Sequence, residues 1–286
     1  MREVTFGDNG AFKTIKKGAI YIDNTTASAT IAREIYEHAK KNGFGSLDAP
    51  VSGGQAGAEN GALTVMIGGD QADFDKAKDK IDCYSKKMKL LGKAGCGQLA
   101  KMVNQICIAG LVQGLSEGIN FGMKAGLNME DVIEVISKGA AQSWQMENRY
   151  KTMIDDKFDF GFAVDWMRKD LKIAMDEAKN NGSLLPITEI IDKYYGEVQE
   201  LGGKRWDTSS LHGNPLSLME NFDHYAVEGT HLYNSFTCQP VCGPARASLQ
   251  SGMYATKTGC FKNRIPLKKN IKTLAKYLSK EGYATG

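Results

Sequence analysis

The sequence has no long hydrophobic run and no closely paired cysteines. Its apolar stretches fall well short of the ~20 residues that cross a membrane. The opening MREVTFGDNG lacks the apolar core of a signal peptide. No CxxC pair or Cys/His cluster has zinc-site spacing, and Cys83, Cys96 and Cys107 are typical of intracellular thiols. We therefore expect a cytoplasmic protein with no membrane partner and no metal site.

The sequence also has little net charge, which is formally +3 over 286 residues. The positive charge is concentrated at the end, because residues 250–286 hold eight Lys or Arg and one Glu. A basic tail can bind nucleic acid, but no aromatic interleaving or nucleic-acid motif accompanies this one. A solvated helix face explains the tail better, so we expect no nucleic-acid partner.

A glycine-rich phosphate-binding turn is missing too, since no GxGxxG follows a strand near the start. Residues 1–92 instead alternate short apolar strands with an amphipathic helix, which predicts an α/β sheet. The predicted strands are 19–25, 45–50, 63–67 and 88–91, and the helix is 30–42. From residue 95 onward the pattern predicts only helices, at 95–126, 131–137, 142–154, 162–180 and 186–200.

The predicted helix at 95–126 carries a stripe of glycines. Apolar side chains fill most of its surface, so we expect it to be buried on most sides. Glycines recur every four residues, and each one inside a helix costs about 1 kcal/mol relative to alanine. They are Gly110, Gly114, Gly118, Gly122 and Gly126. The stripe predicts a surface against which another backbone packs closely, in the same domain or in a second subunit.

Lys101 and Asn104 stand one turn apart near the start of this helix. Burial and the positive end of the helix dipole both disfavour an ammonium, so we expect a lowered pKa for Lys101. Such a lysine could donate and recover a proton while Asn104 orients a hydroxyl or carbonyl. The simpler alternative is a lysine that snorkels to the surface beside an asparagine with no chemical role.

Two further segments could carry chemistry. In DAPVSGG, which begins at Asp48, the Ser52 hydroxyl and the following glycines would let backbone N–H groups approach a carboxylate or phosphate. Ordinary strand-end turns use the same residues. Lys169 and Asp170 are neighbours on a predicted helix, where adjacent residues do not face each other, so we expect each to have its partner elsewhere.

Four motifs occur in order before about residue 211: DAPVSGGQAGAENGALTVMIGGD, GQLAKMVNQ, DWMRKDLKIAMDEAKNNGSLLP and WDTSSL. Together they resemble the β-hydroxyacid dehydrogenases, the family of 3-hydroxyisobutyrate dehydrogenase and tartronate semialdehyde reductase. The resemblance implies a Rossmann-like domain followed by an all-α domain like that of 6-phosphogluconate dehydrogenase. It also implies NAD(P)-dependent oxidation of a small 3-hydroxy acid, or reduction of its semialdehyde, in a homo-oligomer formed through the all-α domain.

The same resemblance implies roles for individual residues. Lys101 matches the catalytic lysine, which acts as acid and base on the reacting oxygen. The substrate-binding positions are matched by Ser52, Gly53, Gly54 and Asn104, while Gln105 stands where the family has a second substrate-contacting asparagine. The cofactor-binding positions are matched by Thr25, Thr26 and Lys169.

The family begins with a GxGxMG turn and about half of a Rossmann sheet, and this sequence shows neither. We therefore expect an incomplete sheet with an open strand edge. We also expect weakened binding of NAD or NADP and impaired turnover, because the turn that holds the pyrophosphate is missing.

From about residue 219 the sequence EGTHLYNSF…QPVCGPARA…LQSG resembles the start of a sulfatase. Cys242, Pro244 and Arg246 match the C-x-P-x-R signature, and Lys257 matches a further basic position. The resemblance implies a cysteine converted to formylglycine that acts beside a calcium ion, although the calcium-binding aspartates do not precede it.

We expect three parts: residues 1–92 as a partial NAD(P)-binding domain, 93–211 as the all-α domain, and 212–286 as a fused, short α/β sulfatase-like fragment. Two alternatives to a dehydrogenase stay open. One is a sulfuric ester hydrolase that uses Cys242, and the other is an inactive helical dimer.

Overall fold

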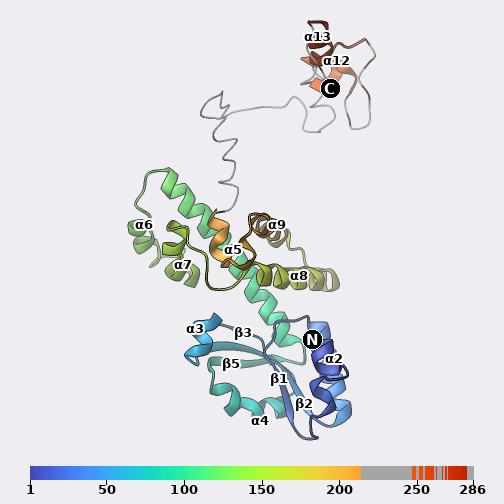
Figure 1. The fold of residues 1–286 in the computed structure, drawn as a ribbon, viewed down its shortest axis with the longest axis vertical. Helices are drawn as coiled ribbons and strands as arrows, with labels where there is room; N and C mark the ends of the chain where they lie inside the picture. The colour runs from blue at the N-terminus through green and yellow to red at the C-terminus, as the bar shows by residue number, and fades with distance from the viewer. Residues whose placement is uncertain are drawn as a thin grey trace. The chain divides into compact units, whose positions relative to one another are not determined.

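The computed structural model describes residues 1–213 and, in the C-terminal part, residues 247–248, 251–253, 255–260, 262, 266, 268 and 270–281. The chain divides into two compact units, Met1–Met219 and Glu220–Gly286 (Figure 1). The first unit contains an α/β part followed by a helical part.

A five-stranded sheet forms the centre of the α/β part. Its strands are β1 (Ile20–Asp23), β2 (Gly45–Asp48), β3 (Val51–Ser52), β4 (Leu63–Gly68) and β5 (Ser85–Gly92). β1 and β2 are parallel, as are β4 and β5, whereas β2 and β3 run antiparallel along the other edge of β4. Among the described strands β1 pairs only with β2, which agrees with the expected open strand edge.

Two of the predicted strands differ from the observed ones. The segment predicted as one strand at 45–50 is divided into β2 and β3, because Pro50 has no N–H to donate to a ladder. β5 begins at Ser85, three residues before its predicted start, since the exposed Lys86 and Lys87 hide the beginning of the apolar pattern.

Five short helical segments accompany the sheet: α1 (Arg2–Phe6), the 3-10 turn η1 (Ala11–Lys13), α2 (Ala29–Asn42), α3 (Gly54–Glu59) and α4 (Gln71–Asp82). α4 packs Ala77 and Ile81 into the core formed by the buried side of the sheet. α2 begins at a Ser28 cap, whose Oγ accepts from Ile31 N at 3.2 Å, and ends at Gly43 with a φ of 80°.

The helical part is built around the 29-residue helix α5 (Cys96–Lys124). Its other elements are α6 (Met129–Ile136), α7 (Trp144–Ile154), α8 (Val164–Asn181), α9 (Pro186–Glu200) and the 3-10 turns η2 (Gly203–Arg205) and η3 (Thr208–Gly213). One apolar cluster joins α5 to α8 and α9, and a second joins α5 to α6 and α7. Every described helix of this part was predicted, with ends that differ by a few residues.

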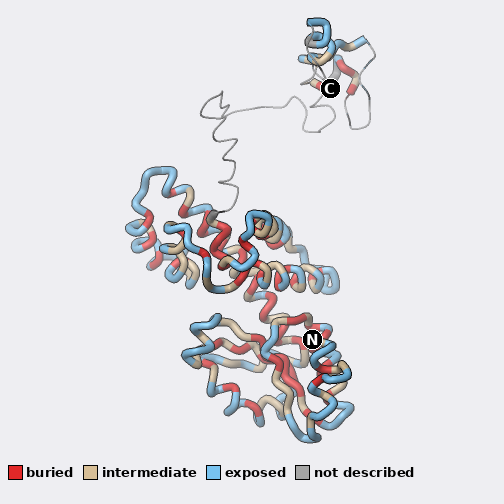
Figure 2. Tube along the Cα trace, viewed as in Figure 1, coloured by how far each residue is buried: buried red, intermediate tan, exposed pale blue. Residues whose placement is uncertain are grey.

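The prediction that α5 is buried on most sides is wrong. Buried residues recur along one face, where α5 meets the other helices. Away from that face the side chains of Val103, Leu111 and Phe121 are 62%, 47% and 73% exposed. Figure 2 shows buried and exposed stretches alternating along the helix. The reason is that α5 is apolar almost all round, while its neighbours within the first unit cover only part of it.

The glycine stripe also differs from the expectation of a neighbouring helix in the same domain. A Cβ added at Gly110, Gly114 or Gly118 would meet no atom within 4 Å. Of the helical glycines in this stripe, Gly122 packs tightly, because a Cβ there would collide with Met129 Sδ of α6. Gly126 lies beyond the helix in a left-handed turn with a φ of 76°.

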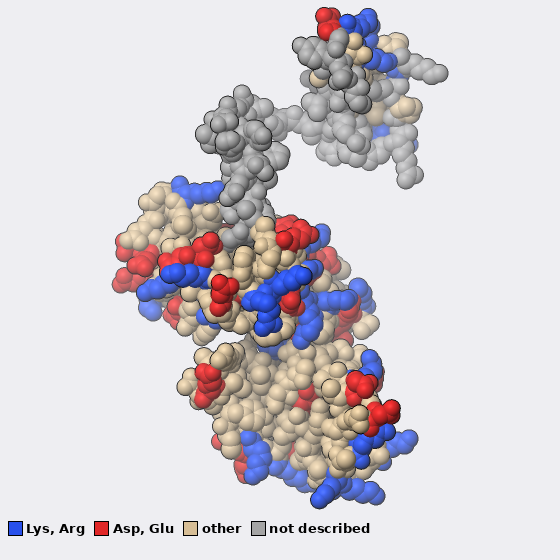
Figure 3. Space-filling model, in the orientation of Figure 1, with Lys and Arg blue, Asp and Glu red and all other residues tan. Residues whose placement is uncertain are grey.

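In the second unit the described residues form two short helices, α12 (Ala255–Thr258) and α13 (Leu274–Lys280). None of the helices in the described ranges combines the length and apolarity required to cross a membrane. On the face drawn in Figure 3, acidic and basic side chains of the first unit lie close together, in keeping with its small net charge.

Candidate active site

The start of α5 is fixed to the sheet by a buried aspartate. Asp48, the last residue of β2, accepts from Gly95 N at 2.8 Å through Oδ1 and from Gln98 N at 2.9 Å through Oδ2. Burial raises the pKa of Asp48, while these backbone N–H groups act in the opposite direction. Gly97 permits this close approach, because a Cβ there would lie 2.5 Å from Asp48 O and Met66 O. The anchor therefore determines where the first turns of α5 lie.

Lys101 stands in the second turn of α5, and only 5% of it is exposed. Burial lowers its pKa from 10.5 to about 8, as the sequence predicts. Asp170 opposes this shift by favouring the ammonium, and Lys169 adds to it. Lys101 is therefore an amine that exchanges a proton near neutral pH.

Asp170, on α8, is 2% exposed. Its Oδ2 accepts a hydrogen bond from Gln105 Nε2 at 2.7 Å. Its Oδ1 lies 2.9 Å from Lys169 Nζ, so the two adjacent residues do meet, although each also has the partner elsewhere that the sequence predicts, Gln105 for Asp170 and Thr26 O for Lys169. The flexible lysine side chain folds back along the helix, and Oδ1 makes this charge contact without hydrogen-bond geometry.

Asn104 and Gln105 form the next link. Asn104 Nδ2 donates to Gln105 Oε1 at 2.8 Å. Gln105 is 2% exposed and its amide is directed to Asp170. Gln105 thus lies buried between Asn104 and Asp170. The sequence does not indicate this burial, since it shows only that a glutamine stands where the family has a second substrate-contacting asparagine.

The threonine pair lies on the loop between β1 and α2. Gln98, fully buried on α5, clamps this loop by accepting from Ala27 N at 2.9 Å and donating to Thr25 O at 2.7 Å. Lys169 Nζ donates to Thr26 O at 2.9 Å. Two side chains from the helical part therefore hold the Thr25–Thr26 loop beside the start of α5. The sequence reasoning missed Gln98, although it stands three residues before the candidate lysine.

Ser52, Gly53 and Gly54 form the turn from β3 into α3. Ser52 is half-buried and pairs with Thr64 of β4, while both glycines are exposed. Gly53 has a φ of 134° and Gly54 a φ of 61°, which glycine adopts readily. This turn follows β2 by a few residues, and β4 contacts α5, so the same sheet carries both the turn and the Asp48 anchor.

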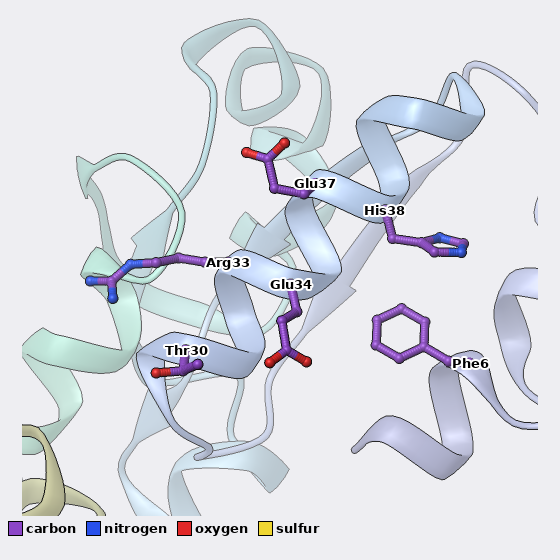
Figure 4. Close-up of a pocket in the computed structure, with 6 residues that line it drawn as sticks. All are labelled: Phe6, Thr30, Arg33, Glu34, Glu37 and His38. Atoms are coloured by element: carbon purple, nitrogen blue, oxygen red, sulfur yellow. The ribbon is translucent and has the colours of Figure 1, made fainter.

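A surface depression of about 580 Å³ lies on the outer side of α2 (Figure 4). It is lined by Phe6, Thr30, Arg33, Glu34, Glu37 and His38. Arg2 Nη2 lies 2.7 Å from Glu34 Oε1 beside it. None of the predicted site residues lines this depression, so it is separate from the Lys101 site.

Three of the sulfatase-like residues, Cys242, Pro244 and Arg246, lie outside the described residues. Lys257 lies on α12 and is exposed. No group of three or more His, Cys, Asp or Glu suited to a metal ion occurs in the ranges that the structure describes. The calcium-dependent arrangement therefore has no described counterpart here.

Family models divide the chain in the same order as the motifs. The model of the NAD-binding domain of 6-phosphogluconate dehydrogenase matches residues 1–92. The model described as NAD-binding of NADP-dependent 3-hydroxyisobutyrate dehydrogenase matches residues 95–213. The sulfatase model matches residues 203–286. In the overlap between the last two, Leu211 is buried with α5, α8 and α9, so 203–213 pack as part of the helical part.

Whole relatives are similar over the same region. An uncharacterized oxidoreductase of Shewanella frigidimarina is 63% identical over 211 residues, which are 74% of this chain and 72% of the relative. The 2-hydroxy-3-oxopropionate reductase of Escherichia coli is 34% identical over 221 residues, 77% of this chain and 75% of that enzyme. The solved structure of Mycobacterium tuberculosis 3-hydroxyisobutyrate dehydrogenase with L-serine is 29% identical, with a TM-score of 0.64 and coverage of 69% and 70%.

Proposed function

Because the chain belongs to the NAD(P)-dependent β-hydroxyacid dehydrogenase family, we propose that it oxidises a small 3-hydroxy acid or reduces the corresponding semialdehyde. The single observation that carries this proposal is the buried Lys101 amine, whose pKa of about 8 suits proton transfer near neutral pH. We propose that Asn104, one turn further along α5, orients the reacting hydroxyl or carbonyl.

In the oxidation direction, neutral Lys101 takes the proton of the substrate hydroxyl. A bound nicotinamide supplies the hydride acceptor. In the reduction direction, the Lys101 ammonium returns a proton to the carbonyl oxygen. The Ser52–Gly54 turn offers one hydroxyl and exposed backbone N–H groups to the substrate carboxylate.

The residues that would hold the dinucleotide are Thr25, Thr26 and Lys169. The loop carrying the two threonines is fixed by Gln98 and Lys169, which supports a preformed contact for the nicotinamide end. We propose that these three residues contribute to the binding of NAD or NADP. Fluorescence titration with NADH and NADPH measures this, and no binding of either dinucleotide would contradict it.

The decisive test replaces the proton carrier. Lys101→Met should lower the rate of 2-hydroxy-3-oxopropionate reduction or 3-hydroxyisobutyrate oxidation by at least about 100-fold. The wild-type oxidation rate should rise with pH and level off above about 8, because the neutral amine is the base. Lys172→Met is the matched control, since Lys172 is exposed and pairs with Asp176 on α8. Equal rates in Lys101→Met and Lys172→Met would contradict the proposal.

The exposed side of α5 supports a homo-oligomer, which we propose forms when a second copy covers Val103, Leu111 and Phe121. Gly110, Gly114 and Gly118 leave room there for the close approach of another helix. Gly114→Leu should fit the single chain, because a Cβ added there meets no atom of another element within 4 Å, but the leucine would obstruct a partner. Light scattering should show dimers for the wild type and monomers for this variant, with unchanged circular dichroism.

We propose the division of the chain at residues 1–92, 93–211 and 212–286. A dehydrogenase is favoured over a sulfuric ester hydrolase, because the oxidoreductase relative matches 74% of the chain while the sulfatase model matches only residues 203–286.

A further inference from the structure

A chain of side-chain hydrogen bonds runs from α8 to the candidate substrate amide on α5. Asp170 Oδ2 accepts from Gln105 Nε2 at 2.7 Å, and Gln105 Oε1 accepts from Asn104 Nδ2 at 2.8 Å. Asp170 and Gln105 are both 2% exposed, so water does not compete for the bond between them, while the bond from Asn104 is partly buried.

The direction of this chain follows from the charge at its end. An ionised carboxylate only accepts hydrogen bonds, so Gln105 must turn its NH₂ group toward Asp170 and its carbonyl toward Asn104. Asn104 must then donate with one N–H. Its own carbonyl oxygen and its second N–H are left for a substrate.

The same carboxylate acts on Lys101, since α5 packs against α8 and Lys101 and Asp170 are only 5% and 2% exposed. The charged groups acting on Lys101 within the described part of the chain are Asp170 and Lys169, both on α8. Asp170 stabilises the ammonium, whereas Lys169 and burial destabilise it. Asp170 Oδ1 lies 2.9 Å from Lys169 Nζ but accepts no hydrogen bond. No hydrogen-bond donor therefore stabilises the negative charge on this oxygen.

We propose that Asp170 is a positioning residue that fixes the donor and acceptor direction of Asn104 through Gln105 and places a negative charge beside Lys101. The inference rests on the proposed function of Lys101 and Asn104. Asp170 touches neither substrate nor cofactor in this role. It sets which group of Asn104 faces the substrate and at which pH Lys101 exchanges its proton.

The first test needs neither substrate nor cofactor. Trace acetylation with acetic anhydride across pH 6–11, followed by mass spectrometry of the Lys101 peptide, gives the midpoint at which this amine becomes reactive. In Asp170→Asn the midpoint should fall by about one pH unit, equal to about tenfold more neutral amine below it. Local unfolding would instead expose Lys101 and move the midpoint up toward 10.5. An unchanged or raised midpoint would overturn the proposal.

Asp176→Asn is the matched control, because Asp176 lies on α8 and is exposed between Lys172 and Lys179. Its Lys101 midpoint should equal the wild-type value. Since labelling is independent of turnover, an inactive wild-type chain would refute the proposed function while leaving this measurement interpretable.

The second test reads the amide direction and serves if Asp170→Asn does not fold. The side-chain ¹⁵N–¹H signals of Asn104 are identified by their loss in Asn104→Ala. Gln105→Leu keeps an apolar helix-forming side chain but removes the acceptor for Asn104, so the more downfield of the two proton signals should move upfield. Signals at the wild-type positions in Gln105→Leu would overturn the relay.

Discussion

Asp207 and Asp170 are two aspartates of the helical part that are almost equally buried, at 1% and 2% exposed. Asp207 accepts from Phe162 N at 2.9 Å, from Ser209 N at 3.0 Å and from Ser209 Oγ at 2.6 Å. Arg149 Nε lies 3.3 Å from its Oδ1. Both oxygens of Asp207 thus have hydrogen bonds. Asp170 has a hydrogen bond on one oxygen only, its other oxygen lies 2.9 Å from Lys169 Nζ, and its charge acts on the buried amine of Lys101.

The comparison shows that burial alone does not separate a structural carboxylate from one in a reactive site. Asp207 joins the loop before α8 to the η2–η3 segment, and its partners are backbone N–H groups, a hydroxyl and one arginine. A fully satisfied carboxylate of this kind stabilises one conformation. Asp170 is left electrostatically coupled to Lys101, so its removal should alter proton affinity more than folding.

The largest expected effect is at the structural carboxylate. Asp207→Ala should lower the free energy of unfolding by about 3–5 kcal/mol, because it leaves buried donors and Arg149 without their acceptor. Urea denaturation followed by circular dichroism measures this. Asp159→Ala, at an exposed aspartate nearby, should change stability by no more than about 0.5 kcal/mol. Equal losses in the two variants would remove the distinction between Asp207 and a surface aspartate.

A second prediction concerns Lys101, the buried amine on which Asp170 acts, and the way it makes stability depend on pH. Between pH 8 and 10.5 the unfolded chain holds a proton on Lys101 that the folded chain has released, so this residue makes stability rise with pH. The total rise is about 3 kcal/mol, and below pH 8 the contribution is flat because both states are protonated. Subtracting the curve of Lys101→Met from that of the wild type isolates it. Parallel curves would contradict the lowered pKa.

The smallest expected effect tests whether the hydrogen bonds to Asp207 contribute separately to stability. Ser209→Ala removes the 2.6 Å hydroxyl bond but keeps the backbone bond from Ser209 N. Stability should fall by about 1 kcal/mol. Thermal denaturation of this variant and Asp207→Ala at the same pH measures the ratio. If Ser209→Ala lost as much stability as Asp207→Ala, the segment around Asp207 would depend on the Ser209 hydroxyl rather than on the carboxylate.

Periodicity predicted the elements well because helices and strands are local. The strands of residues 1–92, helix α2 and every described helix from α5 to α9 follow from apolar spacing and turn residues, whereas α1, α3 and α4 were not predicted. Two interpretations failed where the outcome depends on which neighbours exist. The exposure of Val103 and Phe121 and the open space at Gly114 depend on where α6–α9 pack, and an apolar pattern does not indicate that.

The features of the candidate site also divide into those that the sequence predicts and those that depend on tertiary packing. Lys101 and its lowered pKa could be predicted, because an apolar helix around a lysine implies burial. Gln98 and the Asp48 anchor could not, since their partners lie 47 to 73 residues away. The lysine–aspartate contact at 169–170 was missed because helical geometry constrains Cβ positions, whereas a four-carbon side chain can still fold back.

The sequence by itself determined the order of elements, the family motifs and the lysine that those motifs place on α5. Only the tertiary structure decided that Gln105 is buried between Asn104 and Asp170, and that Asp207 has hydrogen bonds on both oxygens while Asp170 has one on a single oxygen. The physical reason is that hydrogen-bond satisfaction and desolvation belong to pairs of groups brought together by folding, and chain spacing alone does not fix those pairs.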